Sequence, residues 1–543
     1  MKTLKKLLPL VLVLCLMLSL MAACAKSEEP TATTPDTSNA EPESETKGDA
    51  AEAGETENEA PIETSELPDW KDNDPATIVF YYFSMNQNDE AGIERVSEAV
   101  NAITQEKLNI IVDLHTAQLA EYRTAIPMMI AGGEQLDLFN LLNGPLSFPT
   151  LMSNGSLMDI SEILPVYAPD ALELVKDTIG AYTVNGGIYA VTNYRNFNSN
   201  QYVFGRKDVL EELGLVDAFN SMTKWSDWEA ICQEVLDETD YYPMGGSKSV
   251  LWQAGTPSVW NSDSFEFTTY DTLSDATNLL RAENGDPTVK YIYEQEDTKW
   301  TLNKIKEWND RGFVHPETYI SEENNQVLLK NNVIFGAFAK SEIGAAQNWS
   351  SRSGVELLGH LLSDTPVLVT TGQIQMGSMV VPITAEEPEA ALRFMNELYT
   401  NADLLNLIAW GIEGTDYVIN EAGEAAYPNG DSTVSYHNMD YTMGNFFLYL
   451  PWAGNGADYR DVCYAEQLKA VNSDYLGFQL DATEYDVLVS QLVNVYNEYG
   501  PRLNAGFYSE DLLAEMNAKM EASGLRDYIA GVQAQLDAWL AAK

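Results

Sequence analysis

The sequence is poor in the residues that most often build metal sites. It has only four cysteines and four histidines among 543 residues. The histidines are scattered at His115, His315, His360 and His437, and no His-x-x-x-His or Cys-x-x-Cys pair occurs. Transition-metal sites usually need such closely spaced ligands, so we expect no metal site.

Motifs for nucleotide binding and for serine hydrolysis are also missing. The chain has no Gly-x-x-x-x-Gly-Lys-Ser/Thr loop and no Gly-x-Ser-x-Gly turn. A glycosidase needs two carboxylates at a set separation, but among 82 acidic residues the presence of such a pair discriminates nothing. We therefore expect no cofactor and no enzymatic activity, with a secreted glycan-active enzyme as the weaker alternative.

Basic residues are scarce. Lysine and arginine number 31 against 82 acidic residues, which gives a formal net charge of −51. Nucleic-acid binding depends on basic side chains that meet phosphates, so this balance argues against a nucleic-acid partner. The excess acid serves solubility.

Two of the four cysteines, Cys232 and Cys463, lie in the body of the chain, far apart in sequence. An oxidising exterior would permit a disulfide between them. Because Cys232 falls in a predicted helix, we favour two separate buried thiols.

The N-terminus has the features of a secretory signal. A start rich in lysine precedes an apolar run at residues 7–20, and small residues stand before Cys24. This order is typical of a signal peptide. The run is shorter than the roughly 20 residues that a membrane-spanning helix needs, which argues against an uncut anchor.

The end of this signal, Ala22-Ala23-Cys24, resembles the processing site of bacterial lipoproteins. Met21 stands where that site usually has leucine. The resemblance implies that Cys24 becomes the first mature residue and carries lipid, so that residues 1–24 form a lipoprotein signal peptide.

Residues 25–75 are rich in Glu, Thr, Ala, Ser and Pro, with almost no large apolar residue before Ile62. Such a segment cannot bury enough surface to offset its ordering entropy, and its like charges repel. We expect a disordered acidic linker between the signal and the folded body.

The body, residues 76–543, is too long for one compact core. With 45% hydrophobic residues in the whole chain, it has ample material for two lobes. Near its start, strand-like runs at 77–83, 108–114 and 136–142 alternate with helical patterns at 93–103 and 119–131. This β-α-β-α-β order predicts an α/β fold with ligand contacts at the strand ends.

Later segments follow the same pattern. We predict strands at 202–206, 333–339 and 374–383, and helices at 386–400, 402–410, 485–500 and 510–540. No second apolar run reaches membrane-spanning length.

Six segments in order resemble the family 1 extracellular solute-binding proteins, the group that includes maltose-binding protein. They are residues 131–139 (AGGEQLDLF), 155–161 (GSLMDIS), 185–191 (NGGIYAV), 336–338 (GAF), 390–395 (AALRFM) and 410–417 (WGIEGTDY). The last segment is similar to the LplA-type lipoprotein branch of Gram-positive bacteria. Departures are Thr192, where the family usually has proline, and Phe83-Ser84, where it often has an aromatic-glycine pair.

The resemblance implies a type II periplasmic-binding-protein-like fold, with two α/β lobes joined by a hinge around a ligand cleft. We expect lobe I at 76–193 plus 332–385. Lobe II is expected at 194–331 plus 386–543, including the C-terminal helical region. Family members are usually monomers that close on a ligand and dock on ABC permease subunits.

Sugars suit such a site because aromatic rings stack on their C–H faces and polar groups bind their hydroxyls. Our candidate ligand contacts lie at predicted strand ends, in adjoining loops and in the branch-specific segment. They are Tyr82, Phe83, Ser84, Asn140, Asn143, Asn193, Tyr194, Arg195, Trp252, Trp260, Trp349, Trp410 and Glu413. Any one of the aromatics could instead pack in the core, and Glu413 could be structural. Four tryptophans in helical patterns are assigned to the core, namely Trp225, Trp228, Trp300 and Trp308.

These observations predict a lipid-anchored extracellular protein that captures a small ligand for an ABC permease, and an oligosaccharide is the favoured ligand. A peptide, an amino-sugar or a polyamine remains an alternative ligand. Ligand sensing for a membrane receptor remains an alternative role.

Overall fold

The computed structural model describes residues 70, 73–86, 88–246, 248, 258–362, 365–430 and 432–543. The predicted signal peptide, Cys24, the linker up to residue 69 and Trp252 lie outside the described residues. None of the described helices is both long enough and apolar enough to span a membrane.

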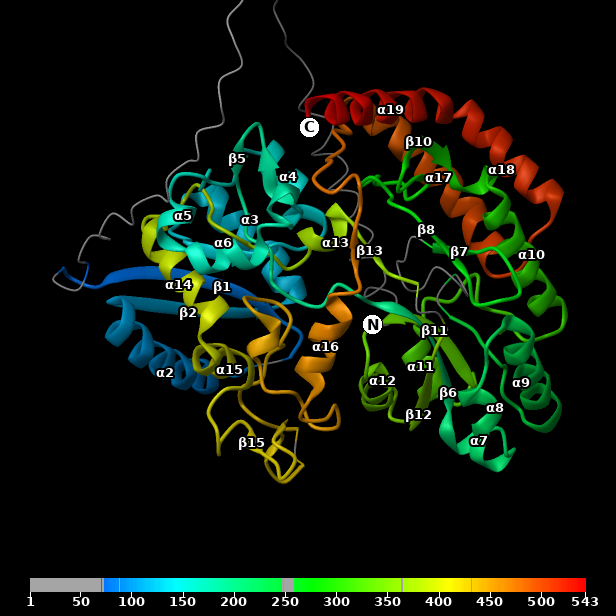
Figure 1. Ribbon diagram of the computed structural model, residues 1–543, viewed down its shortest axis with the longest axis horizontal. Helices are drawn as coiled ribbons and strands as arrows, with labels where there is room; N and C mark the ends of the chain where they lie inside the picture. Colours follow the sequence, from blue (N-terminus) through cyan, green and yellow to red (C-terminus); the bar gives the residue numbers. More distant parts are fainter. Residues whose placement is uncertain are drawn as a thin grey trace, which may run out of the picture. The chain divides into compact units, whose positions relative to one another are not determined.

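The three strands of the predicted β-α-β-α-β order form a four-stranded sheet with β14, and Figure 1 labels β1 and β2 of this sheet. Its order is β14 (Met379–Val380), β3 (Leu138–Asn140), β1 (Ala76–Ser84) and β2 (Ile110–Gln118). β1 pairs in parallel with β2 and β3, whereas β14 is antiparallel to β3. In the apolar run of β1, Ile78, Phe80, Tyr82 and Phe83 are buried, and Val79 and Tyr81 are partly buried.

Helices pack around this β1 sheet. They are α2 (Glu90–Leu108), α3 (Leu119–Gly132), α6 (Pro169–Val175), α14 (Pro388–Thr400) and α15 (Ala402–Trp410). The side chain of Asp89 caps α2 by accepting a hydrogen bond from the amide of Gly92, and the helix ends at Asn109 in the left-handed conformation. In α14, Phe394 and Leu398 join the core, and the Phe394 ring lies 5.5 Å from that of Phe80.

A second sheet consists of β11 (Gly336–Ser341), β6 (Asn200–Arg206) and β12 (Leu357–Leu361), with both outer strands antiparallel to β6. A side chain at Gly336 would place its Cβ 2.6 Å from the carbonyl oxygen of Phe204, so this close pairing requires glycine. Helices α9 (Trp225–Glu238) and α10 (Glu296–Asp310) carry Trp225, Trp228 and Trp308 into a shared aromatic core, as predicted.

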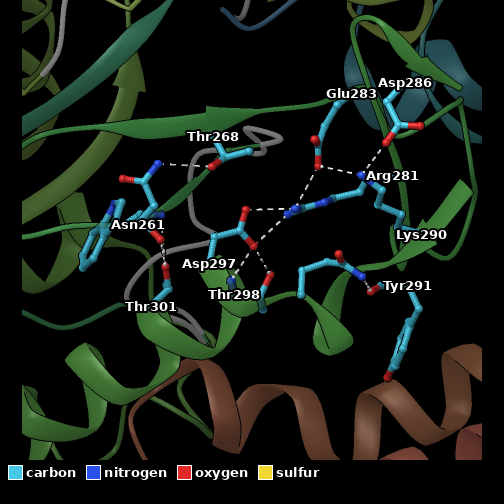
Figure 2. A network of polar contacts seen from close by, with 12 residues as sticks. Asn261, Thr268, Arg281, Glu283, Asp286, Lys290, Tyr291, Asp297, Thr298 and Thr301 are labelled. Atoms are coloured by element: carbon cyan, nitrogen blue, oxygen red, sulfur yellow. Dashed lines mark hydrogen bonds and ion pairs between the residues drawn. The ribbon is translucent and has the colours of Figure 1, made fainter. Parts of the chain in front are cut away.

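The C-terminal helices build a further core. α17 (Asp486–Asn504), α18 (Glu510–Ala522) and α19 (Leu525–Ala542) pack with β9 (Leu280–Glu283) and β10 (Asp286–Tyr291). The hydroxyl of Tyr528 donates to Asp275 (2.6 Å). Beside this core, Arg281 and Lys290 form an ion-pair network with Glu283, Asp286 and Asp297 that joins the two strands to α10 (Figure 2).

Shorter elements complete the described chain. The helices are α4 (Phe148–Ser153), α5 (Leu164–Tyr167), α7 (Lys207–Glu212), α8 (Val216–Asn220), α11 (Asn325–Lys330), α12 (Ala345–Ser353), α13 (Thr371–Gln375) and α16 (Tyr459–Gln467). The strands are β4 (Thr183–Val184), β5 (Gly187–Ile188), β7 (Ser258–Trp260), β8 (Phe267–Thr269), β13 (Leu368–Val369), β15 (Val418–Ile419), β16 (Ala425–Ala426) and β17 (Val471–Asn472).

The strand pairing differs from the predicted division into lobes in two places. We placed 332–385 with the first lobe, but β11 and β12 pair with β6. We placed residues 386–543 with the second lobe, but α14 and α15 share the core of the β1 sheet. The chain therefore returns to the β1 sheet at β14 and stays with its core beyond α15, as far as Tyr449.

The predicted strand at 374–383 is also corrected. A capping box between Thr370 and Gln373 starts α13, and Gly377 then takes a positive φ of 85°. Only β14 remains extended. The alternating apolar residues of this stretch indicated a longer strand than the turn at Gly377 allows.

Cys232 and Cys463 are both buried and free, which confirms two separate thiols over a disulfide. Burial raises the pKa of both thiols, to about 12 for Cys463. They stay protonated at neutral pH, so neither resembles a reactive cysteine.

Candidate functional site

Three segments run between the β1 sheet and the rest of the described body. Residues 194–199 lead from the β1 sheet to β6, residues 365–370 lead back to it after β12, and residues 459–473 lead on to the C-terminal core. They touch one another, because the amide of Phe197 donates to Gln467 Oε1 and β13 pairs with β17. We call this meeting point the junction.

The carboxyl ends of β1 and β3 lie beside the junction and are crossed by residues 436–442. The hydroxyl of Tyr436 is hydrogen-bonded to that of Tyr82, at the end of β1. At the end of β3, Asn140 Nδ2 donates to the carbonyl oxygens of Thr442 (2.7 Å) and Gly377 (3.1 Å). This is the edge at which open α/β sheets bind ligands.

Several polar groups at this edge are buried without a partner. Asn140, Asn193, Asn438 and Thr442 are at most 1% exposed. No hydrogen bond from the described residues reaches Asn140 Oδ1, Asn193 Oδ1, Thr442 Oγ1 or either side-chain polar atom of Asn438. Proteins pair nearly all buried polar groups, so these atoms call for water or the hydroxyls of a ligand.

Charged side chains gather next to this edge. They are Arg195, Lys340, Glu342, Arg352, Asp440 and Arg460. Each interacts electrostatically with another member, except Arg352, which acts on the adjoining Tyr441. Burial lowers the pKa of Lys340 to about 8, and the nearby Arg195 acts in the same direction. Burial raises the pKa of Glu342 to about 7, against the opposing effect of Arg195. Perturbed pKa values of this kind cluster at functional sites.

Aromatic side chains adjoin the charges. The Phe447 ring lies 5.2 Å from Tyr194 and 5.2 Å from Tyr464. Tyr464 is 43% exposed and Tyr441 is 40% exposed. Tyr441 lies within electrostatic range of Arg195. Exposed aromatic rings beside polar groups suit a ligand with both C–H faces and hydroxyls.

Of the predicted contacts, Tyr82, Asn140, Asn193, Tyr194 and Arg195 come together at this edge. Asn193 Nδ2 donates to Gly377 O (2.7 Å), and the amide of Tyr194 donates to Gly444 O (2.9 Å). Nearby, the buried side chain of Phe83 packs among core residues.

Ser84 and Asn143 form local hydrogen bonds. The hydroxyl of Ser84 accepts from the amide of Asn86, and Asn143 accepts from Arg123. Neither contact ties these two residues to the junction.

The predicted tryptophans are dispersed. Trp260 is buried in the aromatic core, with its ring 3.7 Å from Trp225 and 5.1 Å from Trp308. Trp349 is half-buried and stacks on Phe204 (4.7 Å). Trp410 is buried and stacks on His437 (5.2 Å).

Glu413 lies in the Gly411–Gly414 turn, where its backbone bridges to Tyr417. Its neighbour in the same segment, Asp416, is fully buried and pairs with Arg95. The branch-specific segment thus has a structural anchor in Asp416, while the role of Glu413 stays a prediction.

Lys340, Glu342, Asp440, Tyr441 and Thr442 were missed by the sequence analysis. They follow no recognisable motif, and their closeness to Arg195 depends on chain segments more than 140 residues downstream of it. The partial signal was Lys340 and Glu342, two charged residues directly after the buried run of β11.

The pH dependence of stability should reveal the raised pKa of the partly buried Glu342 carboxyl. Its pKa is raised in the fold, so the folded state retains a proton that the unfolded state loses near its ordinary pKa of 4.5. Its contribution to stability is therefore lost as the pH rises from about 4.5 through 7. Glutamine does not titrate, so the stability of Glu342→Gln relative to wild type should increase by about 2 kcal/mol from pH 5 to pH 8. Thermal melting at both pH values measures this change.

The exposed Glu234 on α9 provides the matched control for this substitution. Glu234→Gln should show the same pH profile as wild type. Parallel profiles for Glu342→Gln and wild type would contradict a raised pKa of the Glu342 carboxyl.

The sequence is similar to that of a known protein family and of a transporter component. Residues 474–541 match the family described as a domain of unknown function (DUF3502). The chain is 22% identical over 458 residues to a carbohydrate ABC transporter substrate-binding protein of Streptococcus pneumoniae serotype 4, covering 81% of this chain and 87% of that protein.

Solved structures share the arrangement. The N-glycan transport solute-binding protein NgtS of Streptococcus pneumoniae superimposes with a TM-score of 0.72 at 18% identity, over 86% of this chain and 99% of that one. The chain has the fold of an ABC-transporter solute-binding protein. The resemblance noted in the sequence is thereby confirmed.

A second solved structure agrees. It is the HMO-binding, ABC-transporter-associated solute-binding protein of Bifidobacterium longum infantis, with a TM-score of 0.58 at 14% identity over 86% of this chain and 99% of that one. Both matches cover nearly all of the described body. The type II fold with its mixture of helices and strands is therefore as predicted.

Proposed function

We propose that this protein captures an oligosaccharide outside the cell and delivers it to an ABC-type permease. The observation that carries the proposal is the set of unpartnered amide and hydroxyl groups at the carboxyl edge of the β1 sheet. They lie beside exposed aromatic rings, in a fold shared with solved proteins named for binding glycans. Sugar hydroxyls would satisfy these groups and C–H faces would cover the rings.

Ligand capture by such a fold requires movement about the junction. The three crossing segments are the only covalent links that the described residues supply between the β1 sheet and the rest of the body. We infer that they form the hinge and that the lobes close on bound ligand. A ligand drives closure only to the extent that it binds the closed form more tightly than the open form.

The same proposal includes the location and partners. Cys24 would carry the lipid, the acidic residues 25–75 would serve as a tether, and the protein would act as a monomer on the extracellular face of the membrane. Permease subunits would receive the ligand. The curated relative is named as a transporter component and not as an enzyme, which supports binding without turnover.

The alternatives differ in ligand charge. A polyamine would have to approach Arg195 and Lys340, and like charges at short range repel. A peptide or an amino-sugar remains an alternative ligand, to be distinguished by the melting experiment described below. Ligand sensing would use the same site, and uptake of labelled ligand through the permease separates it from transport.

The proposal predicts ligand-dependent stabilisation. The full chain should melt at a temperature several degrees higher, about 2–5 °C, when an oligosaccharide is present at 100-fold excess over its dissociation constant. The measurement is thermal melting against a panel of oligosaccharides, monosaccharides, peptides and polyamines, with the sugar analysed afterwards. A response to peptides or polyamines alone, or cleavage of the sugar, would overturn the proposal.

A further inference from the structure

Two cations near the junction lack carboxylate partners. Among the described residues, no carboxylate oxygen lies within 4 Å of the charged nitrogens of Arg195 or Lys340. Arg195 makes one long hydrogen bond, to the carbonyl oxygen of Gln373 (3.4 Å), and its guanidinium lies 4.6 Å from the Phe197 ring centroid. Both side chains are only partly exposed.

Such a pair is costly unless an anion joins it. Taking a cation out of water is unfavourable without a counter-charge, and a second cation nearby adds repulsion. The carboxylate that acts on Arg195, Glu342, is itself largely removed from water. Asp440 is already held by Arg460. Neither of these acids therefore forms an ion pair with Arg195 or Lys340.

The local charge also opposes that of the chain as a whole. The cluster contains four cations, Arg195, Lys340, Arg352 and Arg460, against the carboxylates of Glu342 and Asp440. The complete chain has a net charge of −51. A local excess of cations on so acidic a protein attracts anionic ligands to this one place.

We propose that the ligand is an acidic glycan whose carboxylate binds between Arg195 and Lys340, an inference that rests on the proposed function. The unpartnered groups of Asn140, Asn193 and Thr442 provide for the hydroxyls of the same sugar. Tyr441 supplies an exposed ring beside Arg195. A uronic acid or a sialic acid combines these features in one residue.

The test compares matched acidic and neutral sugars by titration calorimetry on the full chain. The probes are a glucuronate-terminated disaccharide, sialyllactose, their neutral counterparts cellobiose and lactose, and methyl glucuronide alone. At least one acidic probe should bind about 10- to 100-fold more tightly than its neutral counterpart, and added salt should reduce the difference.

Lys340→Met should abolish that preference, so that the acidic probe and its neutral counterpart bind with similar affinity. Lys330→Met, at the exposed end of α11, makes the same charge change elsewhere and should keep it. Arg195→Gln should also abolish the preference, and serves as the second variant if Lys340→Met does not fold, as judged by melting.

Each outcome decides a different point. Equal or tighter binding of the neutral sugars overturns the acidic-glycan inference and leaves the proposed function standing. Binding of methyl glucuronide without binding of any oligosaccharide supports the carboxylate site and overturns oligosaccharide capture. Absence of binding by every probe overturns both.

Discussion

Replacing Asp297 by alanine is expected to lower the free energy of unfolding by about 3–5 kcal/mol. The side chain of Arg281 is 4% exposed and that of Asp297 is 12% exposed, so water screens their contact little. Asp297 accepts two hydrogen bonds from Arg281, at 3.1 and 2.8 Å (Figure 2). Among the described residues, its removal leaves Glu283, which is more exposed, as the one carboxylate paired with the buried guanidinium.

Substitution of the partner, Arg281, should lower the free energy of unfolding by less. After Arg281→Met, Asp297 still accepts a hydrogen bond from the amide of Thr298 (2.6 Å) in the first turn of α10, where a negative charge is favourable. Methionine also keeps apolar contact with the Tyr270 ring, over which the guanidinium lies at 5.0 Å. The double variant Arg281→Met/Asp297→Ala should therefore be more stable than Asp297→Ala alone, because no charge remains unpaired.

Urea unfolding of the three variants and wild type measures this order. Asp286, at the exposed end of the same network, provides the matched control, since its pair with Lys290 is solvated. Asp286→Asn should leave the urea midpoint almost unchanged. A loss below about 1 kcal/mol for Asp297→Ala, or no recovery in the double variant, would show that the pair is not effectively buried.

The sequence predicted the β1 sheet because its signals are local. Continuous apolar runs such as that of β1 are typical of parallel strands covered on both faces, and the helices between them have a 3.6-residue period. Topology then placed Asn140 at the edge where such sheets bind ligands, and Asn193 lies there too. These residues could be chosen without knowing any distant contact.

The rest of the candidate site depends on distant contacts. Residues 436–442 return to cross the ends of β1 and β3 after hundreds of intervening residues, and no periodicity encodes that return. The antiparallel pairing of β11 with β6 likewise joins segments more than 130 residues apart, which is why the predicted lobe boundary misplaced 332–361. The charge of Lys340, near the end of β11, points to the site only once Arg195 is known to lie near it.

Tryptophan was the least informative signal. The sequence does not distinguish a tryptophan that stacks on a sugar from one that fills a core, because both have similar flanking residues. Trp260 was predicted as a ligand contact, yet its ring packs between Trp225 and Trp308 and is 4% exposed. Only the folded structure separates it from Trp349, whose ring remains half-exposed.

Trp260→Ala is accordingly expected to lower the free energy of unfolding by about 3–5 kcal/mol. The ring touches Trp225, Trp308 and Phe338, and its removal would leave a cavity that these large rings cannot fill without moving. The backbone of Trp260 is held in place independently, because its amide donates to the hydroxyl of Thr301 and its carbonyl accepts from the same group. The strand should therefore stay paired around the cavity.

Trp300, on the same helix α10, is the control. It lies at the edge of the core and is partly exposed, so Trp300→Ala should cost only about 1–2 kcal/mol. Unfolding in urea measures both losses, and titration calorimetry below the unfolding transition measures ligand affinity. Because Trp260 lies in the core, its substitution should lower stability while the folded fraction keeps wild-type affinity. A Trp260→Ala variant with wild-type stability and weakened binding would contradict the core assignment and indicate that Trp260 contacts the ligand.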